Sequence, residues 1–360
     1  MKEAPDRVGP MKQTDHSSMT IRDVAHAAGV GVGTVSRVLN DGLHVSPGTR
    51  ERVLTAIRQL EFRPNAQARR ILRRHAGMVC FLLSNRDFLH SFHARILQGV
   101  ETYASVLKQN VVFAAVHYNA GTRSNRIQLP PILSERGWVD GLILAGTTYP
   151  NFLRRIESFH IPFVAFGNNV VGLNGRNRFD QVRFDDATAE CEATRYLVEQ
   201  GHRSIAFVGD TSSAWIQQRY IGYVAAMRAS RLKLMPLCRP HGSSYSDYGN
   251  WAAPRLVARR PRPTAIVAAN DEIAYGLWRS LRRSGIRVPD EVSLVGFDDR
   301  EEALLMDPQL TTVRVHKEEI GRDLMKLLLD KLRQPGSRFI KHVVPTELVI
   351  RGTVKRLSAG

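Results

Sequence analysis

Apolar residues near the start of the chain recur at helical spacing, at Val24, Ala25 and Ala28. Thr20, followed three residues later by Asp23, forms a capping-box pattern, so a helix should begin here. Gly29 can take the left-handed backbone conformation that ends a helix, and a second short helix is predicted from Val32 to Leu39. Two short helices joined by a tight glycine turn predict a helix-turn-helix, whose second helix enters the major groove of DNA.

The first residues of that second helix are expected at base edges, namely Val32, Gly33, Thr34, Ser36 and Arg37. The glycines at positions 29, 31 and 33 also suggest a dinucleotide-binding loop, but such a loop follows a strand, and residues 23–28 have a helical pattern. A small helical pair with no role on DNA is the other alternative. The segments that follow favour DNA.

The segment after the turn predicts a third helix with a basic stretch behind it. Ser46 and Pro47 suit the N-cap and the first helical position. Apolar residues then follow at helical spacing, at Val53, Leu54, Ile57 and Leu60. Residues 20–75 contain ten Arg, no Lys and four Asp or Glu, a net charge of +6. Because Arg side chains make bidentate contacts with phosphate and guanine, this charge suits a DNA-binding segment.

From about Gly77 the pattern changes to short β-type runs that alternate with helical stretches. The expected strands are Met78–Leu83, Val111–Val116, Gly141–Leu144, Phe163–Phe166, Ser204–Val208, Ala265–Ala268 and Val292–Gly296. The expected helices are Arg95–Leu107, Ala187–Glu199, Arg219–Ser230, Glu272–Ser284 and Glu318–Leu332. Alternation of strand and helix predicts parallel sheets covered on both faces, and the length of this part favours two α/β lobes over one.

The chain has 360 residues, of which 43% are hydrophobic and 24% charged, an ordinary globular composition. Its net charge of +17 suits a polyanionic partner, although such a charge can equally belong to a solvated surface. No apolar run reaches the length of a membrane span and no signal-peptide core is present, so we expect a cytoplasmic protein without a membrane partner.

Candidate chemistry is sparse outside the DNA-binding pattern. The three cysteines, Cys80, Cys191 and Cys238, are scattered, which favours reduced thiols and no metal site. No nucleophile, acid–base pair or phosphate loop stands out, so no catalytic residue and no cofactor are expected.

Several blocks near the start of the chain resemble the headpiece of the lactose/galactose repressor family. The blocks are Asp23-Val24-Ala25, Ala28-Gly29-Val30, Thr34 to Asn40, Val45-Ser46 with Thr49-Arg50, and Arg63 to Ala66 with Ala68-Arg69. The resemblance implies that four residues contact the DNA backbone, namely Thr20, Ser36, Asn40 and Asn65. It also implies that Val32, Gly33 and Arg37 face the bases.

The resemblance further implies a hinge helix, Asn65 to Leu72, that enters the minor groove and has Ala68 and Arg69 among its DNA contacts. Two positions depart from the family pattern. Gly31 stands where the family commonly has a capping serine, and glycine caps less well. Ile71 stands where the family usually has the leucine that wedges between base pairs, so either Ile71 or Leu72 is the expected wedge.

A second set of blocks resembles the effector domain of the same family. The blocks are Gly201-His202-Arg203, Arg219 with Gly222-Tyr223, Ala268 to Asp271, Gly285 to Pro289, Ser293 to Asp299, and Leu310 to Val313. They imply the two-lobed fold of periplasmic sugar-binding proteins, with a ligand in the cleft. Arg219, Asn270 and Asp298 match the family's polyol-binding positions, and Phe92 stands where an aromatic residue commonly lines the first lobe.

Each of these polar residues also has an interpretation that needs no ligand. Asn270 and Asp298 can cap the segments that follow them, and Arg219 can be a solvated residue at a helix start. Gly167 occupies a position where many sugar-responsive members have Asp, so the effector class is left open, with Asn168 or Asn169 as substitutes.

These patterns together predict an α/β protein with a helix-turn-helix headpiece, a hinge helix and a two-lobed domain like periplasmic binding proteins. The expected parts are a flexible tail at 1–18, the headpiece at 19–63, the hinge at 64–76, an effector-binding and dimerisation domain at 77–352, and a tail at 353–360.

The predicted function is that of a sequence-specific, DNA-binding transcriptional repressor. We expect a homodimer that binds a palindromic operator in double-stranded DNA under the control of a small molecule, a carbohydrate or related polyol. The alternative is an α/β enzyme or binding protein that acts on a sugar or nucleotide. The effector, the operator and the direction of control are left open.

Overall fold

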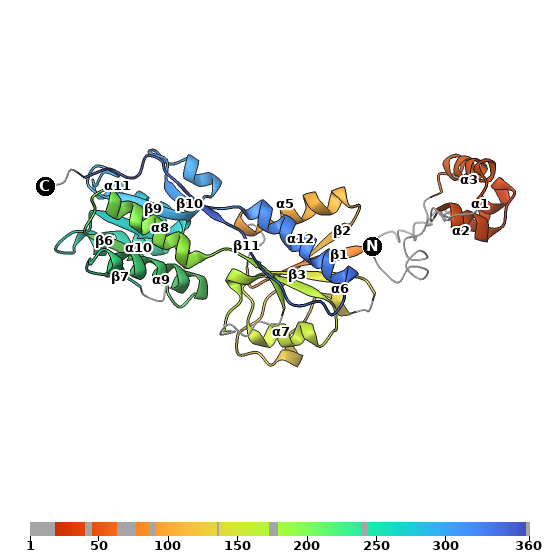
Figure 1. Cartoon of the computed structure of the whole chain (residues 1–360), viewed down its shortest axis with the longest axis horizontal. Coiled ribbons are helices and arrows are strands. Elements are labelled where there is room, and N and C mark those ends of the chain that lie inside the picture. The colour runs from red at the N-terminus through yellow and green to blue at the C-terminus, as the bar shows by residue number, and fades with distance from the viewer. Residues whose placement is uncertain are drawn as a thin grey trace, which may run out of the picture. The chain divides into compact units, whose positions relative to one another are not determined.

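The computed structural model describes residues 19–39, 45–62, 77–86, 91–134, 137–172, 179–238 and 244–357. The chain divides into two compact units, Met1–His75 and Ala76–Gly360 (Figure 1). Several predicted DNA contacts lie outside the described residues, namely Asn40, Asn65, Ala68, Arg69, Ile71 and Leu72. The expected hinge helix and the tail at 1–18 lie there too.

The first unit is a three-helix bundle made of α1 (Ile21–Ala28), α2 (Val32–Leu39) and α3 (Pro47–Gln59). Its small core has members from all three helices, including Val24, Ala28, Val35, Val38, Val53 and Ala56. The apolar spacing in the sequence therefore predicted the three helices and the buried residues of α1. In α3 it was only partly right, since Val53 is buried but Leu54 is 41% exposed.

The second unit contains two mainly parallel sheets, which define lobe 1 and lobe 2. Lobe 1 has the strand order β11-β5-β4-β3-β1-β2 and lobe 2 has the order β12-β10-β9-β8-β6-β7. The strands of lobe 1 are β1 (Met78–Ser84), β2 (Asn110–Val116), β3 (Gly141–Gly146), β4 (Phe163–Phe166), β5 (Asp180–Arg183) and β11 (Lys341–Val343). Those of lobe 2 are β6 (Ile205–Val208), β7 (Met235–Leu237), β8 (Ala265–Ala268), β9 (Ser293–Asp298), β10 (Thr311–Val315) and β12 (Thr346–Val349). Only the β10–β12 pair is antiparallel among these described strands.

Helices cover both faces of the sheet in lobe 1, as a parallel sheet requires. Alternate residues of β1 enter two different cores: Phe81 packs with α5 (Ser91–Val106) and α12 (Lys317–Arg333), and Leu82 packs with α7 (Pro150–Glu157). The short helix α6 (Pro131–Ser134) lies in the second of these cores. Figure 1 shows α5 and α12 side by side along one face of the sheet.

Lobe 2 is built in the same way, with helices packed around its sheet (Figure 1). The helices are α8 (Asp186–Glu199), α9 (Ala214–Ala229), α10 (Tyr245–Val257) and α11 (Asp271–Arg283). They pack in two close pairs, α8 with α9 and α10 with α11.

Three short connections join the lobes within this unit. The chain passes from β5 to α8, from β10 to α12 and from β11 to β12. Each connection is only a few residues long, and they lie close together because β5 pairs with β11 and β10 pairs with β12. The carboxyl ends of the strands in each lobe carry the loops where ligands bind in such sheets.

Every strand and helix predicted in this unit is present, with bounds that differ by a few residues. The prediction missed α6, α7 and α10, as well as the short strands β5, β7, β10, β11 and β12. In the described part of the chain, no helix combines the length and apolar character needed to cross a membrane.

Candidate functional site

The turn between α1 and α2 has the geometry that its sequence predicts. The Thr20 side chain caps α1 by accepting from the Asp23 N–H, and the Asp23 carboxylate accepts from the Thr20 N–H at 2.7 Å. Hydrogen bonds from Thr20 hold the pKa of Asp23 below its usual value. Gly29 ends the helix in the left-handed conformation, at φ 62°. Both capping residues were identified from the sequence.

The second helix presents the predicted base-facing residues on its exposed side. Val35 and Val38 are buried in the bundle core, whereas Val32, Gly33 and Arg37 are exposed. Positions 33 and 37 are one helical turn apart, so the glycine leaves open space beside the arginine. Thr34 and Ser36 are half-buried beside this surface. Arg37 is therefore the only long polar side chain among the five described candidates.

Gly31 takes the capping position of this helix. Its carbonyl oxygen accepts from the Thr34 and Val35 N–H groups, at 2.8 and 3.2 Å. With no side chain, it gives α2 none of the extra capping bonds that Thr20 and Ser46 give to α1 and α3.

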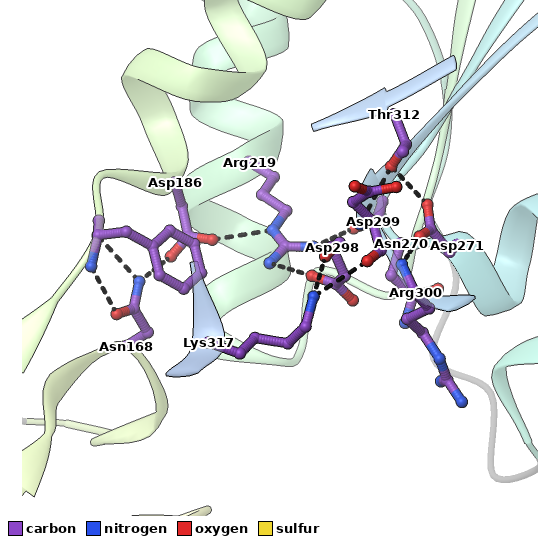
Figure 2. Close-up of polar contacts among 12 residues, drawn as sticks. Asn168, Asp186, Arg219, Asn270, Asp271, Asp298, Asp299, Arg300, Thr312 and Lys317 are labelled. Atoms are coloured by element: carbon purple, nitrogen blue, oxygen red, sulfur yellow. Dashed lines mark hydrogen bonds and ion pairs between the residues drawn. The ribbon is translucent and has the colours of Figure 1, made fainter. Parts of the chain in front are cut away.

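In the second unit, Arg219 of α9 is buried at 2% exposure among acceptors from three segments (Figure 2). Its Nε donates to the Asp186 carboxylate at 2.8 Å, and its Nη2 donates to Asp298 at 3.1 Å. Its Nη1 donates to the Ala269 carbonyl oxygen at 2.6 Å. The guanidinium carbon also lies 3.5 Å from the centroid of the Phe297 ring. All three nitrogens of Arg219 therefore have a protein partner.

Asp298 ends β9 in an unusual backbone conformation. Its φ is 112° and that of Asp299 is 47°, a region that L residues rarely adopt. Lys317 holds this corner from α12, since its Nζ donates to the carbonyl oxygens of Asp298 at 2.6 Å and Asp299 at 3.1 Å (Figure 2). Strained residues persist where several contacts fix them, and they concentrate at functional sites.

Burial shapes the protonation of this cluster. It raises the pKa of the Asp186 carboxyl, against the opposing attraction of Arg219. It raises the pKa of Glu190, one turn further along α8, to about 8, and the Oε2 atom of Glu190 has no hydrogen-bond partner in the described part of the chain. Burial lowers the pKa of Arg219, but the Asp298 and Asp186 carboxylates reverse that effect and raise it. The guanidinium therefore keeps its charge and the carboxyls compete for it.

Asn270 has two roles that its sequence position suggested separately. Its side-chain oxygen accepts from the Ile273 N–H at 2.9 Å and so caps α11. It also lines a cavity of about 40 Å³ between the lobes, together with Phe92, Arg219 and Asp298. The structure thus brings the four predicted effector-site residues to one place.

Asn168 and Asn169 differ in what they contact. Asn168 holds the connection from β5 to α8, because its Nδ2 donates to the Asp186 carboxylate at 2.7 Å and to the Phe184 carbonyl oxygen at 2.9 Å. Asn169 contacts His93 at 3.2 Å and lines the interlobe space. A Cβ at Gly167 would lie 2.4 Å from the end of the Gln181 side chain, so a side chain here would require Gln181 to move.

The sequence analysis missed Asp186, Lys317 and Glu190. Asp186 is the first residue of α8, three residues after the end of β5, and that place near the carboxyl end of a strand was a usable signal. Lys317 and Glu190 gave no comparable signal, because their positions depend on how α12 and α8 pack.

A larger cavity of about 760 Å³ adjoins the small one and is also lined by both lobes. Arg86, Asn169, Trp215 and Tyr245 line both cavities. Its volume is in the range of small-molecule sites. The interlobe space is therefore large enough for a metabolite, with the Arg219 cluster at one end.

Two parts of the chain match known families. Residues 20–65 match the family described as bacterial regulatory proteins, lacI family, and residues 194–354 match the periplasmic binding protein-like domain. Catabolite control protein A from Priestia megaterium is 30% identical over 314 residues, which cover 86% of this chain and 92% of that protein.

Solved structures agree with this assignment. The chain resembles the lac repressor dimer bound to operator and the anti-inducer ONPF, with a TM-score of 0.79 and 25% identity over 94% of this chain and 100% of that one. It also resembles the complex of the transcriptional regulator CelR with cellobiose, with a TM-score of 0.66 and 29% identity over 93% of this chain and 99% of that one. These relatives regulate transcription, so the enzyme alternative is set aside. The chain belongs to the lacI family of bacterial regulatory proteins and is a DNA-binding transcription regulator.

Proposed function

We propose that this protein is a homodimeric repressor whose affinity for a palindromic operator is controlled by a small carbohydrate or related polyol between the lobes. The observation that carries the proposal is the presence of both parts in one chain: an exposed recognition helix and an interlobe space with buried polar groups. A ligand acts on DNA binding only to the extent that it binds one arrangement of the lobes better than another.

The DNA-binding part of the proposal rests on the exposed side of α2. Val32 offers a methyl surface to the major groove and is 42% exposed, whereas Gly33 offers no side chain. Arg37 then supplies the hydrogen bonds that distinguish bases, since a bidentate Arg–guanine contact gives about 1–3 kcal/mol of discrimination. Thr20 lies at the start of α1, where an exposed hydroxyl suits a phosphate contact.

The effector part rests on the Arg219 cluster. Asp298, Asn270 and Asn169 bring acceptors and amide groups to the interlobe cavity, and such groups suit the hydroxyls of a sugar. Because Arg219 already has three partners, we expect it to position Asp298 and not to bind the ligand alone. The relative CelR has cellobiose in its solved complex, which supports a carbohydrate.

Arg37→Ala tests the readout. We expect this variant to lose about 1–3 kcal/mol of preference for operator over random DNA, because it loses its base contact. The operator is first selected from a pool of random duplexes with the full-length protein, with and without candidate sugars. Fluorescence anisotropy then measures binding of operator and random DNA.

Arg52→Ala is the matched control, since Arg52 is an exposed arginine on α3 and its removal changes the charge equally. This control should weaken operator and random DNA to the same degree. Equal losses for both DNAs in Arg37→Ala would refute the assigned base contact.

A further inference from the structure

The larger interlobe cavity has a lining that differs from that of the Arg219 cluster. Lobe 1 contributes the segments after β1, β2 and β3, including Asn85, Arg86, Tyr118 and Thr147. Lobe 2 contributes the first residues of α9 and α10, including Trp215 and Tyr245. A molecule in this cavity of about 760 Å³ therefore contacts both lobes at once.

Aromatic pairs form opposite walls of this cavity. Tyr118 and Tyr149 are edge-to-face in lobe 1, with centroids 6.2 Å apart. Trp215 and Tyr245 are edge-to-face in lobe 2, with centroids 5.6 Å apart. All four rings are only half-buried. Such rings pack well against the flat apolar face of another ring, including the C–H face of a sugar.

The lining of this cavity has a basic and no acidic character in the part of the chain that the structure describes. None of its residues in the described part of the chain is Asp or Glu, whereas Arg86 and His117 are present. The Nε atom of Arg86 is buried and has no hydrogen-bond partner among the described residues. Since Arg86 also lines the smaller cavity, it lies where the two spaces meet. A buried guanidinium N–H without a partner is costly, so this position suits an acceptor on a ligand.

The start of α9 adds to this polarity. Ser212, Ser213 and Ala214 line the cavity, and the Ser213 side chain makes no capping hydrogen bond. The start of this 16-residue helix therefore lines the same space as Arg86, and Ser213 does not cap its first N–H groups. Asp210 accepts from the Ser212 N–H at 2.9 Å, but it is not part of the lining.

We propose that the effector is an anionic carbohydrate, a sugar that carries a phosphate or a carboxylate. Its ring lies between the aromatic walls, its hydroxyls face Asn169 and Asp298, and its anionic group pairs with Arg86 near the start of α9. This inference rests on the proposed function, because it names the class of effector for the same interlobe site. It also fits the lining of the two spaces, since the described lining of the larger cavity contains no carboxylate, whereas in the smaller cavity Asp298 is paired with Arg219.

Isothermal titration of the full-length protein with matched sugars tests this inference. The pairs are glucose with glucose 6-phosphate, ribose with ribose 5-phosphate, and glucose with glucuronate, and inorganic phosphate is tested alone. At least one anionic sugar should bind at least tenfold more tightly than its neutral parent and than inorganic phosphate. A preference for neutral sugars, or no binding by any anionic sugar of the panel, overturns the proposal.

Two variants locate the binding group. Arg86→Gln should weaken binding of the anionic sugar at least tenfold more than it weakens binding of the neutral parent. Arg126→Gln is the matched control, because Arg126 is exposed, belongs to the same lobe and lines neither cavity. The affinity of this variant for the anionic sugar should equal that of the wild type. Equal affinity of Arg86→Gln and wild type for the anionic sugar contradicts the proposal.

Operator binding by anisotropy is measured on the same samples. If the protein binds operator and none of the anionic sugars, the effector class is wrong and the proposed repressor stands. If the protein binds an anionic sugar but its affinity for the operator does not change, the site is confirmed and the proposed control of DNA binding is wrong.

Discussion

Three carboxyl groups compete for one buried guanidinium in the interlobe site. Asp186 and Asp298 hold Arg219 directly, whereas Glu190 is completely buried and only within electrostatic reach of it. Because Asp186 and Asp298 already contact the guanidinium, a charge on Glu190 would be poorly compensated. Glu190 therefore stays protonated in the folded protein over most of the neutral range.

This protonation predicts a pH-dependent stability. Burial raises the pKa of Glu190 from 4.5 to about 8, so the folded state keeps a proton that the unfolded chain has released. Stability then falls as pH rises from about 4.5 to about 8. Thermal unfolding of Glu190→Gln should lack this loss and leave the variant more stable than wild type at pH 8 by up to a few kcal/mol, at about 1.4 kcal/mol per pKa unit.

The neighbours of Glu190 differ from those of exposed carboxyls on the same helix, which provides a control for this measurement. Asp186 lies on the same helix and Arg219 on the neighbouring one, and Thr194 donates to Glu190 at 3.5 Å. Glu199→Gln, at an exposed position of the same helix, should keep the slope of the wild type. Identical slopes for wild type and Glu190→Gln would show that the carboxyl is already ionised.

The sequence predicts only some of the individual residues of the interlobe site. Arg219, Asn270 and Asp298 were identified because they stand in motifs, and the structure brings them with Phe92 to one cavity. Their contact with an effector stays a prediction. Asp186, Glu190 and Lys317 were missed, since pairing with Arg219 or Asp298 is decided by tertiary packing.

Glycines set the spacing of the helix pairs in the second unit. A Cβ at Gly99 of α5 would lie 2.0 Å from the Glu318 carbonyl oxygen of α12, and a Cβ at Gly321 of α12 would lie 2.0 Å from the Ile96 carbonyl oxygen of α5. The same reciprocal contact joins α10 and α11 through Gly249 and Gly276. These pairs are therefore in backbone-to-backbone contact.

Gly321→Ala should destabilise the second unit by about 1–3 kcal/mol, because the added methyl group meets backbone that cannot move away cheaply. Urea denaturation, followed by circular dichroism, measures the change. Gly121→Ala is the control, since nothing lies within 4 Å of a Cβ there, and it should change the free energy of unfolding by less than about 1 kcal/mol. A variant Gly321→Ala as stable as wild type would show that the helices separate freely.

Long elements were predicted better than short ones. The strands and helices with strong periodicity were found, whereas α10 was missed although it spans 13 residues, since Pro254 lies within it. Strands such as β5 and β7 are too short to show a period. Their places are fixed by neighbours in the sheet, which a local pattern does not contain.

The proposed dimer gives a prediction for the whole molecule. A single recognition helix contacts few base pairs. The dimer should therefore bind a palindromic duplex at least tenfold more tightly than it binds a duplex with one half-site. Sedimentation velocity of the full-length protein with palindromic and half-site duplexes, at equal salt, measures both the assembly and the affinity. A monomer that binds the half-site with full affinity would refute the dimer.

Because the chain crosses between the lobes three times, the folded units are completed in a fixed order during synthesis. The helices of the DNA-binding unit are made first, and their core needs nothing that comes later. Lobe 1 waits for α12 and β11, which are made after nearly all of lobe 2. At about 5–20 residues per second, a nascent chain carries its recognition helix for many seconds before the regulatory site exists. The DNA-binding unit can therefore fold before the effector site that is proposed to control it has been synthesised.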